Sequence, residues 1–204
     1  MSKIQTNQIQ HTANGAAVYT LPQTDGSAGQ VLQTNGSGVL SWVTLPSAGL
    51  TVAQTFRQTG TNATNNSAAT FTSGWEKADG VGEGGYGSFA DPSSGIFTFP
   101  TPGFYYITFT SYFEDTGYNT NAYIQIQATT DNSSYSTISS THFGTTYDQS
   151  GYNYQSGFVN AILDVTDVTQ VKVKFRAFSN STVSWDGSDT QNRTAATFLR
   201  IGDT

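Results

Sequence analysis

Two histidines and fourteen carboxylates are the side chains of this chain that could act as acids, bases or metal ligands. His142, in Ser-Thr-His-Phe, could serve as a general base, but no motif places a nucleophile or a carboxylate beside it, and His11 has even less support. Glycoside hydrolysis would need two acids held opposite one another, and no spacing of the acids predicts such a pair. The sequence therefore predicts a protein that is not an enzyme and that has no catalytic residues.

Four aspartates are the candidate ligands for a cation. They form the pairs Asp164 with Asp167 and Asp186 with Asp189, each in a segment rich in turn-forming residues. Carboxylate and backbone oxygens suit calcium, but hydrated turns explain the same residues more simply. We expect no required cofactor, and calcium binding stays open as an alternative.

Five aromatic residues stand among Gly, Ser, Asn and Asp, where rings can stack on sugars or grip a protein surface while their neighbours supply hydrogen bonds. These candidate receptor-binding residues are Tyr118, Tyr147, Tyr152, Tyr154 and Trp185. The alternative interpretation is that the rings pack beneath their own loops or between subunits.

The charge balance argues against several classes of partner. The net charge is −6, with eight Lys and Arg and no basic cluster in the sequence, which gives little support to binding of nucleic acid or of an anionic membrane. No apolar run approaches the roughly 20 residues of a membrane span, and Met1 to Thr6 lacks the apolar core of a signal peptide. With no Cys as well, we expect a virion protein assembled in the host cytoplasm, or a bacterial surface protein exported by another route.

The elements that would position these residues are predicted to be strands. In the segment 95–113, β-branched and aromatic residues are interrupted once, by Pro100-Thr-Pro-Gly103, which predicts a strand, a tight turn and a longer strand. Alternation divides the second strand into two faces, both aromatic: Tyr105, Ile107, Phe109 and Phe113 on one, and Phe104, Tyr106, Thr108, Thr110 and Tyr112 on the other. A sandwich buries only one face of each strand, so the second face predicts a neighbouring subunit.

Similar patterns predict further strands, about ten in all, which is typical of a jelly-roll β-sandwich. They cover approximately 50–56, 70–75, 121–128, 135–143, 157–163, 171–177 and 195–201, and the segments 59–68, 76–89 and 145–155 are expected to be loops. The fold class is all-β.

The central segment resembles the jelly rolls of the complement-component-1q and tumour necrosis factor family. Phe97, Gly103, Tyr105 and Phe109 have the spacing of the family signature, Ile107 replaces its middle Phe, and Ala90 stands where it has an aromatic residue or Leu, with Phe89 one place earlier. The resemblance covers roughly residues 50 to 204. It implies a homotrimer whose contacts come from the central and final strands, with the interface or core candidates Phe104, Tyr105, Tyr106, Phe109 and Phe198.

Residues 1–48 read as short strands and turns, with turn signals at Asn14-Gly15, Asp25-Gly26 and Asn35-Gly36. The segments 14–22 and 35–46 look like two copies of one unit, each too small to bury its apolar groups in one chain. The string from Asp25 to Trp42 resembles segments of phage tail fibres. A disordered linker is the alternative. We place the boundary at Pro46-Ser-Ala-Gly49, which divides the chain into 1–48 and 49–204.

These features together predict a trimeric bacteriophage tail-fibre protein located in the virion. Residues 1–48 would attach to other virion proteins, and the jelly-roll knob, 49–204, would bind a host surface glycan or protein through avidity, without nucleic acid and without membrane insertion. A head fibre or capsid decoration protein and a bacterial surface adhesin are the alternatives. A surface-polysaccharide depolymerase would need an acidic cleft.

Overall fold

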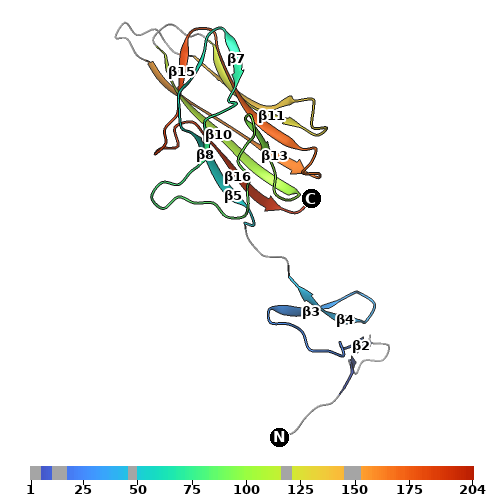
Figure 1. Cartoon of the computed structure of the whole chain (residues 1–204). Coiled ribbons are helices and arrows are strands. Elements are labelled where there is room, and N and C mark those ends of the chain that lie inside the picture. The colour runs from blue at the N-terminus through green and yellow to red at the C-terminus, as the bar shows by residue number, and fades with distance from the viewer. Residues whose placement is uncertain (1–5, 11–17, 46–49, 116–120, 145–152) are drawn as a thin grey trace. The chain divides into compact units, whose positions relative to one another are not determined.

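A computed structural model describes residues 6–10, 18–45, 50–115, 121–144 and 153–204 (Figure 1). Within these ranges every regular element is a strand, and no helix there could cross a membrane. The chain divides into two compact units, Met1–Ala48 and Gly49–Thr204. The all-β class predicted from the sequence is confirmed.

The second unit is a sandwich of two antiparallel sheets. In the seven-stranded sheet the order is β6 (Asn62–Thr64), β15 (Val183–Asp186), β10 (Gly103–Asp115), β16 (Ala195–Gly202), β5 (Ala53–Gln58) and β8 (Trp75–Lys77), with β13 (Asn153–Val165) along the other side of β10. In the five-stranded sheet it is β12 (Ser136–Phe143), β11 (Ala122–Thr129), β14 (Lys172–Ser179) and β7 (Ser67–Thr70), with β9 (Ile96–Thr98) also paired to β14. Figure 1 shows β10 passing between β13 and β16.

Strand β10 alternates between the interior and the outside of the sandwich along its whole length. Tyr105, Ile107, Phe109 and Phe113 are fully buried, whereas the residues between them are exposed or half-buried. The two faces predicted from the sequence are therefore confirmed. Because one face of a strand from each sheet points inward, the core forms where the sheets meet.

Phenylalanine rings from both sheets fill the centre of the core. The ring of Phe97 lies 5.2 Å from those of Phe56, Phe175 and Phe198, and the ring of Phe109 lies 4.7 Å from that of Phe175. Most of these contacts are edge-to-face or tilted, the arrangements that aromatic quadrupoles favour.

The family-like signature has a physical reason at each position. Phe97, Tyr105 and Phe109 are buried, and Gly103 adopts φ +144 where a Cβ would lie 2.5 Å from Arg200 Nε and from Gly202 O. The missing aromatic at exposed Ala90 is supplied by buried Phe89, whose ring centroid lies 4.7 Å from that of Phe198.

Three local predictions are wrong. The strand expected over 70–75 is interrupted, because the chain turns at Gly74 (φ +77) and Trp75 Nε1 donates a hydrogen bond to Phe71 O. The loop expected over 59–68 contains β6 and the first two residues of β7, because β6 pairs with β15 and β7 pairs with β14. Strand β13 begins at Asn153, inside the loop expected over 145–155, because it pairs with β10 as far as Asp115.

The first unit consists of two antiparallel pairs, β1 (Gln8–Gln10) with β2 (Val18–Thr20) and β3 (Gln30–Thr34) with β4 (Leu40–Thr44). The turn predicted at Asn35-Gly36 joins β3 to β4, and Asn35 Oδ1 accepts hydrogen bonds from the amides of Ser37 and Val39. The turn predicted at Asn14-Gly15 lies outside the described residues. No described residue of this unit is buried, so the described residues form no core within one chain.

Candidate functional site

The outer face of the seven-stranded sheet carries the main unpartnered apolar surface of the second unit. Strand β13 runs antiparallel to β10, so Tyr106 is paired with Ile162 and Thr110 with Phe158, while Leu199 of β16 flanks Tyr106 on the other side. Phe158 is 52% exposed and Ile162 64% exposed. We call this surface the assembly face and define it by Phe104, Tyr106, Tyr112, Phe158, Ile162 and Leu199.

The structure sorts the interface or core candidates into two groups. Tyr105, Phe109 and Phe198 are fully buried inside the sandwich and contribute to its core. Phe104 and Tyr106 point to the opposite side of β10 and belong to the assembly face, where Phe104 is exposed and Tyr106 is half-buried. Only the latter two are placed where a second subunit could contact them.

Two tyrosines form a stacked pair at one end of the assembly face. The ring of Tyr154 lies 5.8 Å from that of Tyr112 with an interplanar angle of 9°, and the guanidinium carbon of Arg193 lies 6.0 Å from the Tyr112 centroid. Tyr154 was predicted as a loop residue but belongs to β13, where it stays more than half exposed. The other candidate tyrosines, Tyr118, Tyr147 and Tyr152, lie outside the described residues.

Trp185, the remaining receptor-binding candidate, is placed in the core, so its prediction as a surface residue is wrong. It is fully buried on β15, where it pairs with Phe113 of β10. Its indole Nε1 donates a 2.8 Å hydrogen bond to Thr64 Oγ1, and its ring contacts those of Phe113 and Phe143. A ring so enclosed cannot contact a receptor without unfolding of the strand.

Several acids of the segment 76–83 surround one buried guanidinium. Arg57 is 1% exposed and donates hydrogen bonds to Glu76 (2.7 Å), to Glu83 (3.1 Å) and to Asp79. The hydrogen bond to Glu76, with the neighbouring negative charges, raises the pKa of Arg57 above its ordinary value despite burial. These acids therefore hold the loop that follows β8 against β5.

The four candidate calcium ligands do not come together. Asp167 Oδ1 accepts hydrogen bonds from the amide and hydroxyl of Thr169, which lower the pKa of its carboxyl, and Asp186 lies 3.7 Å from Arg193. Asp164 and Asp189 are exposed. Among the described residues, no group of three or more His, Cys, Asp or Glu side chains could hold a metal ion.

His142 is exposed on β12, in the other sheet, with Nδ1 3.4 Å from Asn121 Oδ1 and its ring against that of Tyr123. This setting gives it a surface packing role. His11 lies outside the described residues.

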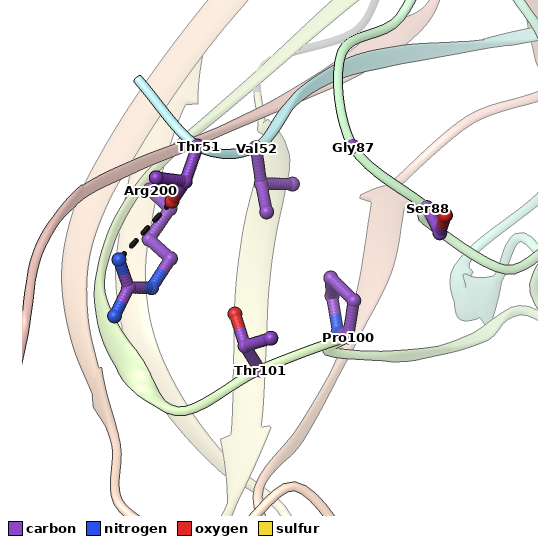
Figure 2. Close-up of a pocket in the computed structure, with 7 residues that line it drawn as sticks. All are labelled: Thr51, Val52, Gly87, Ser88, Pro100, Thr101 and Arg200. Carbon is purple, nitrogen blue, oxygen red and sulfur yellow. Dashed lines mark hydrogen bonds between the residues drawn. The ribbon is translucent and has the colours of Figure 1, made fainter. Parts of the chain in front are cut away.

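A pocket of about 440 Å³ opens at the end of the sandwich near the start of β10 (Figure 2). Its walls come from four separate segments, including Val52, Ser88, Pro100 and Arg200, so sequence spacing gave no signal for it. The Arg200 guanidinium donates to Pro102 O, to Thr51 Oγ1 and to Asp203. Since Arg200 already has protein partners, it is poorly placed to hold an anionic ligand in this pocket.

The fold has counterparts among solved structures. Eiger TNF of S. frugiperda superposes with a TM-score of 0.58 at 14% identity, covering 75% of this chain and 94% of that chain. Murine APRIL at pH 5.0 gives 0.52 at 10% identity, covering 74% of this chain and 98% of that chain. No protein-family model and no curated protein sequence matches the chain. At such identities the likeness shows the fold, a TNF-like jelly roll, and confirms the predicted sandwich.

Proposed function

We propose that this chain is a homotrimeric fibre protein of a bacteriophage virion whose jelly-roll unit recognises the surface of the host cell. The assembly face is the observation that carries the proposal. It leaves Phe158, Ile162 and Phe104 in water on an otherwise polar molecule, and contiguous apolar surface of this kind marks sites of protein association. A symmetric set of subunits would cover it.

Three subunits are favoured by the resemblance of the Phe97 to Phe109 signature to a family of trimeric jelly rolls. The first unit gives independent support for assembly, because Ile9, Leu32, Val39 and Leu45 are all exposed in the single chain. Neighbouring copies of the same hairpins could cover these residues as they wind along a shaft.

Attachment to a virion is supported by the fibre-like string from Asp25 to Trp42 and by the polar composition without Cys. In a trimer each exposed loop is presented three times, so weak contacts with a cell surface add up through effective concentration. We assign the recognition role to the second unit and the attachment role to the first.

The test of assembly replaces apolar residues of the assembly face by charge. Phe158→Asp and Ile162→Asp should each convert a trimer into monomers, measured by light scattering after size-exclusion chromatography, because three buried carboxylates would face one another. Ile138→Asp is the matched control, since Ile138 is 40% exposed on β12 of the other sheet. A monomeric wild-type chain, or variants that stay trimeric, would exclude this interface.

The recognition role is tested by immunogold electron microscopy with an antibody to residues 50–204, applied to particles and cells of the source culture. Gold at the tips of tail fibres, with blocking of adsorption by the isolated chain, is the expected result. Gold over the head would favour a decoration protein, and gold on cells alone would favour an adhesin. Release of reducing sugar from host polysaccharide would reveal an enzyme.

A further inference from the structure

We infer that the outer face of the five-stranded sheet binds an acidic polysaccharide of the host surface. This inference rests on the proposed recognition function and names its ligand class. It starts from strand β14, where Lys172, Lys174 and Arg176 alternate with buried Val173 and Phe175 and so share the outer side of the sheet. We call these three side chains the basic row.

The two sheets differ sharply in charge. The five strands that make up the sheet of the basic row contain no Asp or Glu, although the chain as a whole carries a net charge of −6. The strands of the other sheet contain five carboxylates, namely Glu76, Glu114, Asp115, Asp164 and Asp186. Folding therefore gathers three of the eight basic residues on one face without acids.

The basic row is not neutralised within the described chain. The ion pairs found there involve Arg57, Lys77, Arg193 and Arg200, and none includes a member of the basic row. Lys174 Nζ lies 4.2 Å from the ring centroid of Tyr135, a contact that holds the ammonium in place and leaves its charge uncompensated.

Two acidic turns flank the start of β14 in the sequence and the sheet, and their carboxylates bond to neutral groups of their own turns and form no ion pair with the basic row. Asp131 Oδ1 accepts bonds from Thr129 Oγ1 and from the amides of Ser133 and Ser134. Asp167 Oδ1 accepts bonds from Thr169. The N–H donors of the basic row, which no described carboxylate engages in an ion pair, can therefore bind an external anion.

The neighbours of the basic row suit a sugar polymer. On the neighbouring strand β11, Gln125 is paired with Arg176 of β14, and Gln127 is paired with Lys174 of β14. The Gln125 Oε1 atom is buried and has no hydrogen-bond partner among the described residues, so turning this side chain outward beside Arg176 would lose no bond within the described chain and could gain one from a sugar hydroxyl. Amides beside cations are a combination that matches a ligand with both hydroxyl and carboxylate groups.

An aromatic group continues the basic row beyond Arg176. The rings of Phe178 and Tyr123 stack at 4.8 Å, and the His142 ring lies 4.9 Å from that of Tyr123. This group supplies apolar ring surface beside the charges, which suits the C–H groups of sugar rings. The proposed track therefore runs along β14 from Lys172 to Phe178.

Spacing and charge favour a polysaccharide over nucleic acid. Alternate side chains of a strand are about 6.7 Å apart, so the three cations span about 13 Å and meet an extended polymer that carries charges at intervals. Three cations on a chain of net charge −6 are a small number for a ligand as densely charged as nucleic acid. The basic row also lies on the opposite side of the sandwich from the assembly face, so a trimer would display it three times.

The test measures binding of full-length trimer to alginate, a uronic-acid polymer, by biolayer interferometry, with neutral dextran and single-stranded poly(dT) as comparison probes. Lys174→Gln with Arg176→Gln should weaken alginate binding at least about tenfold, the loss expected for one charge-assisted hydrogen bond. The loss of affinity between about 50 and about 200 mM salt should also become smaller, since fewer counterions are released.

The control is Lys77→Glu, which lowers the net charge by the same two units on the other sheet. It should leave alginate binding unchanged. Equal binding of alginate by wild type and by the basic-row variant, or binding of poly(dT) in preference to alginate, would overturn the inference.

Binding of the trimer to whole cells separates this inference from the proposed function. If the basic-row variant still binds host cells, the proposed host recognition stands, but the outer face of the five-stranded sheet is not its site. A trimer that binds alginate through the basic row but binds no host cell would retain the polysaccharide site and reject host recognition.

Discussion

Trp185 illustrates how a residue that looks like a ligand-binding aromatic can instead be structural. Its ring is enclosed between the two sheets, and its one polar atom is satisfied by Thr64 Oγ1. The Thr64 hydroxyl is in turn hydrogen bonded to Ser179, which belongs to the opposite sheet. The indole therefore contributes both apolar burial and a polar link between the sheets.

We expect Trp185→Ala to lower the free energy of unfolding by about 3–5 kcal/mol, because a large buried ring leaves a cavity. Urea denaturation followed by circular dichroism, at one fixed protein concentration, measures the change. Tyr86→Ala is the control: Tyr86 is 63% exposed, so its loss should change stability by no more than about 0.5 kcal/mol. Loss of cell binding by Trp185→Ala with unchanged unfolding would contradict the buried placement.

The sequence could not distinguish these two roles for Trp185. Its neighbours, Ser184, Asp186 and Gly187, are typical of a loop, and the apolar–polar alternation of Val-Ser-Trp-Asp in β15 covers only four residues, the shortest run that indicates a strand. What buries the ring is the pairing of β15 with β10 on one side and with β6 on the other, and these contacts connect residues far apart in the chain. Local sequence patterns carry no signal of such pairing.

At the scale of elements, the sequence predicted a strand correctly where inward-facing and outward-facing residues alternate over many positions. Strand β10 has thirteen residues, and its aromatic and β-branched residues fixed both of its faces correctly. Strand β14 was equally clear, because cations alternate with buried apolar residues. The same alternation separates Lys172, Lys174 and Arg176 in the sequence, and their significance as a charged surface depends on the pairing of β14 with strands that contain no acids.

The turn between β11 and β12 depends on one carboxylate. The hydrogen bonds that Asp131 accepts, first from the Thr129 hydroxyl and then from the amides of Ser134 and Ser133, hold the pKa of Asp131 well below its ordinary value. A lowered folded-state pKa stabilises the protein above the unfolded value of about 3.9, and this contribution is lost as the pH falls below that value.

We therefore expect Asp131→Asn to lower the melting temperature most at pH 6. The difference from wild type should narrow as the pH falls from about 4 to about 2, where the carboxyl of the unfolded chain is protonated. Differential scanning calorimetry across this range measures it. Asp189→Asn, at an exposed position, provides the comparison and should change little. A difference in melting temperature between wild type and Asp131→Asn that stays constant with pH would mean that the ionised carboxylate of Asp131 contributes no stability.

At the scale of the whole molecule, the two units differ in what holds them together. All buried residues of the described chain belong to the second unit, whose core contains aromatic rings from both sheets. The first unit has its two strand pairs joined by a Thr20–Val39 bridge and by the hydrogen bond from Trp42 Nε1 to Thr24 O, but none of its side chains in 6–10 and 18–45 is buried. Hydrogen bonds exposed to water contribute little net stability, so a single copy of the first unit cannot offset its loss of conformational entropy.

This difference predicts separate behaviour of the two units. The fragment 50–204 should unfold cooperatively with a melting temperature within about 2–4 °C of the full chain, a shift equivalent to about 1 kcal/mol. The fragment 1–48 alone should show no cooperative transition. Fused to a trimeric coiled coil, the same fragment should gain slowly exchanging amides in β3 and β4, measured by hydrogen exchange, because three copies can bury Val31, Leu32 and Val39 against one another. A monomeric 1–48 fragment with protected amides would show that the first unit folds without partners and would remove its support for trimeric assembly.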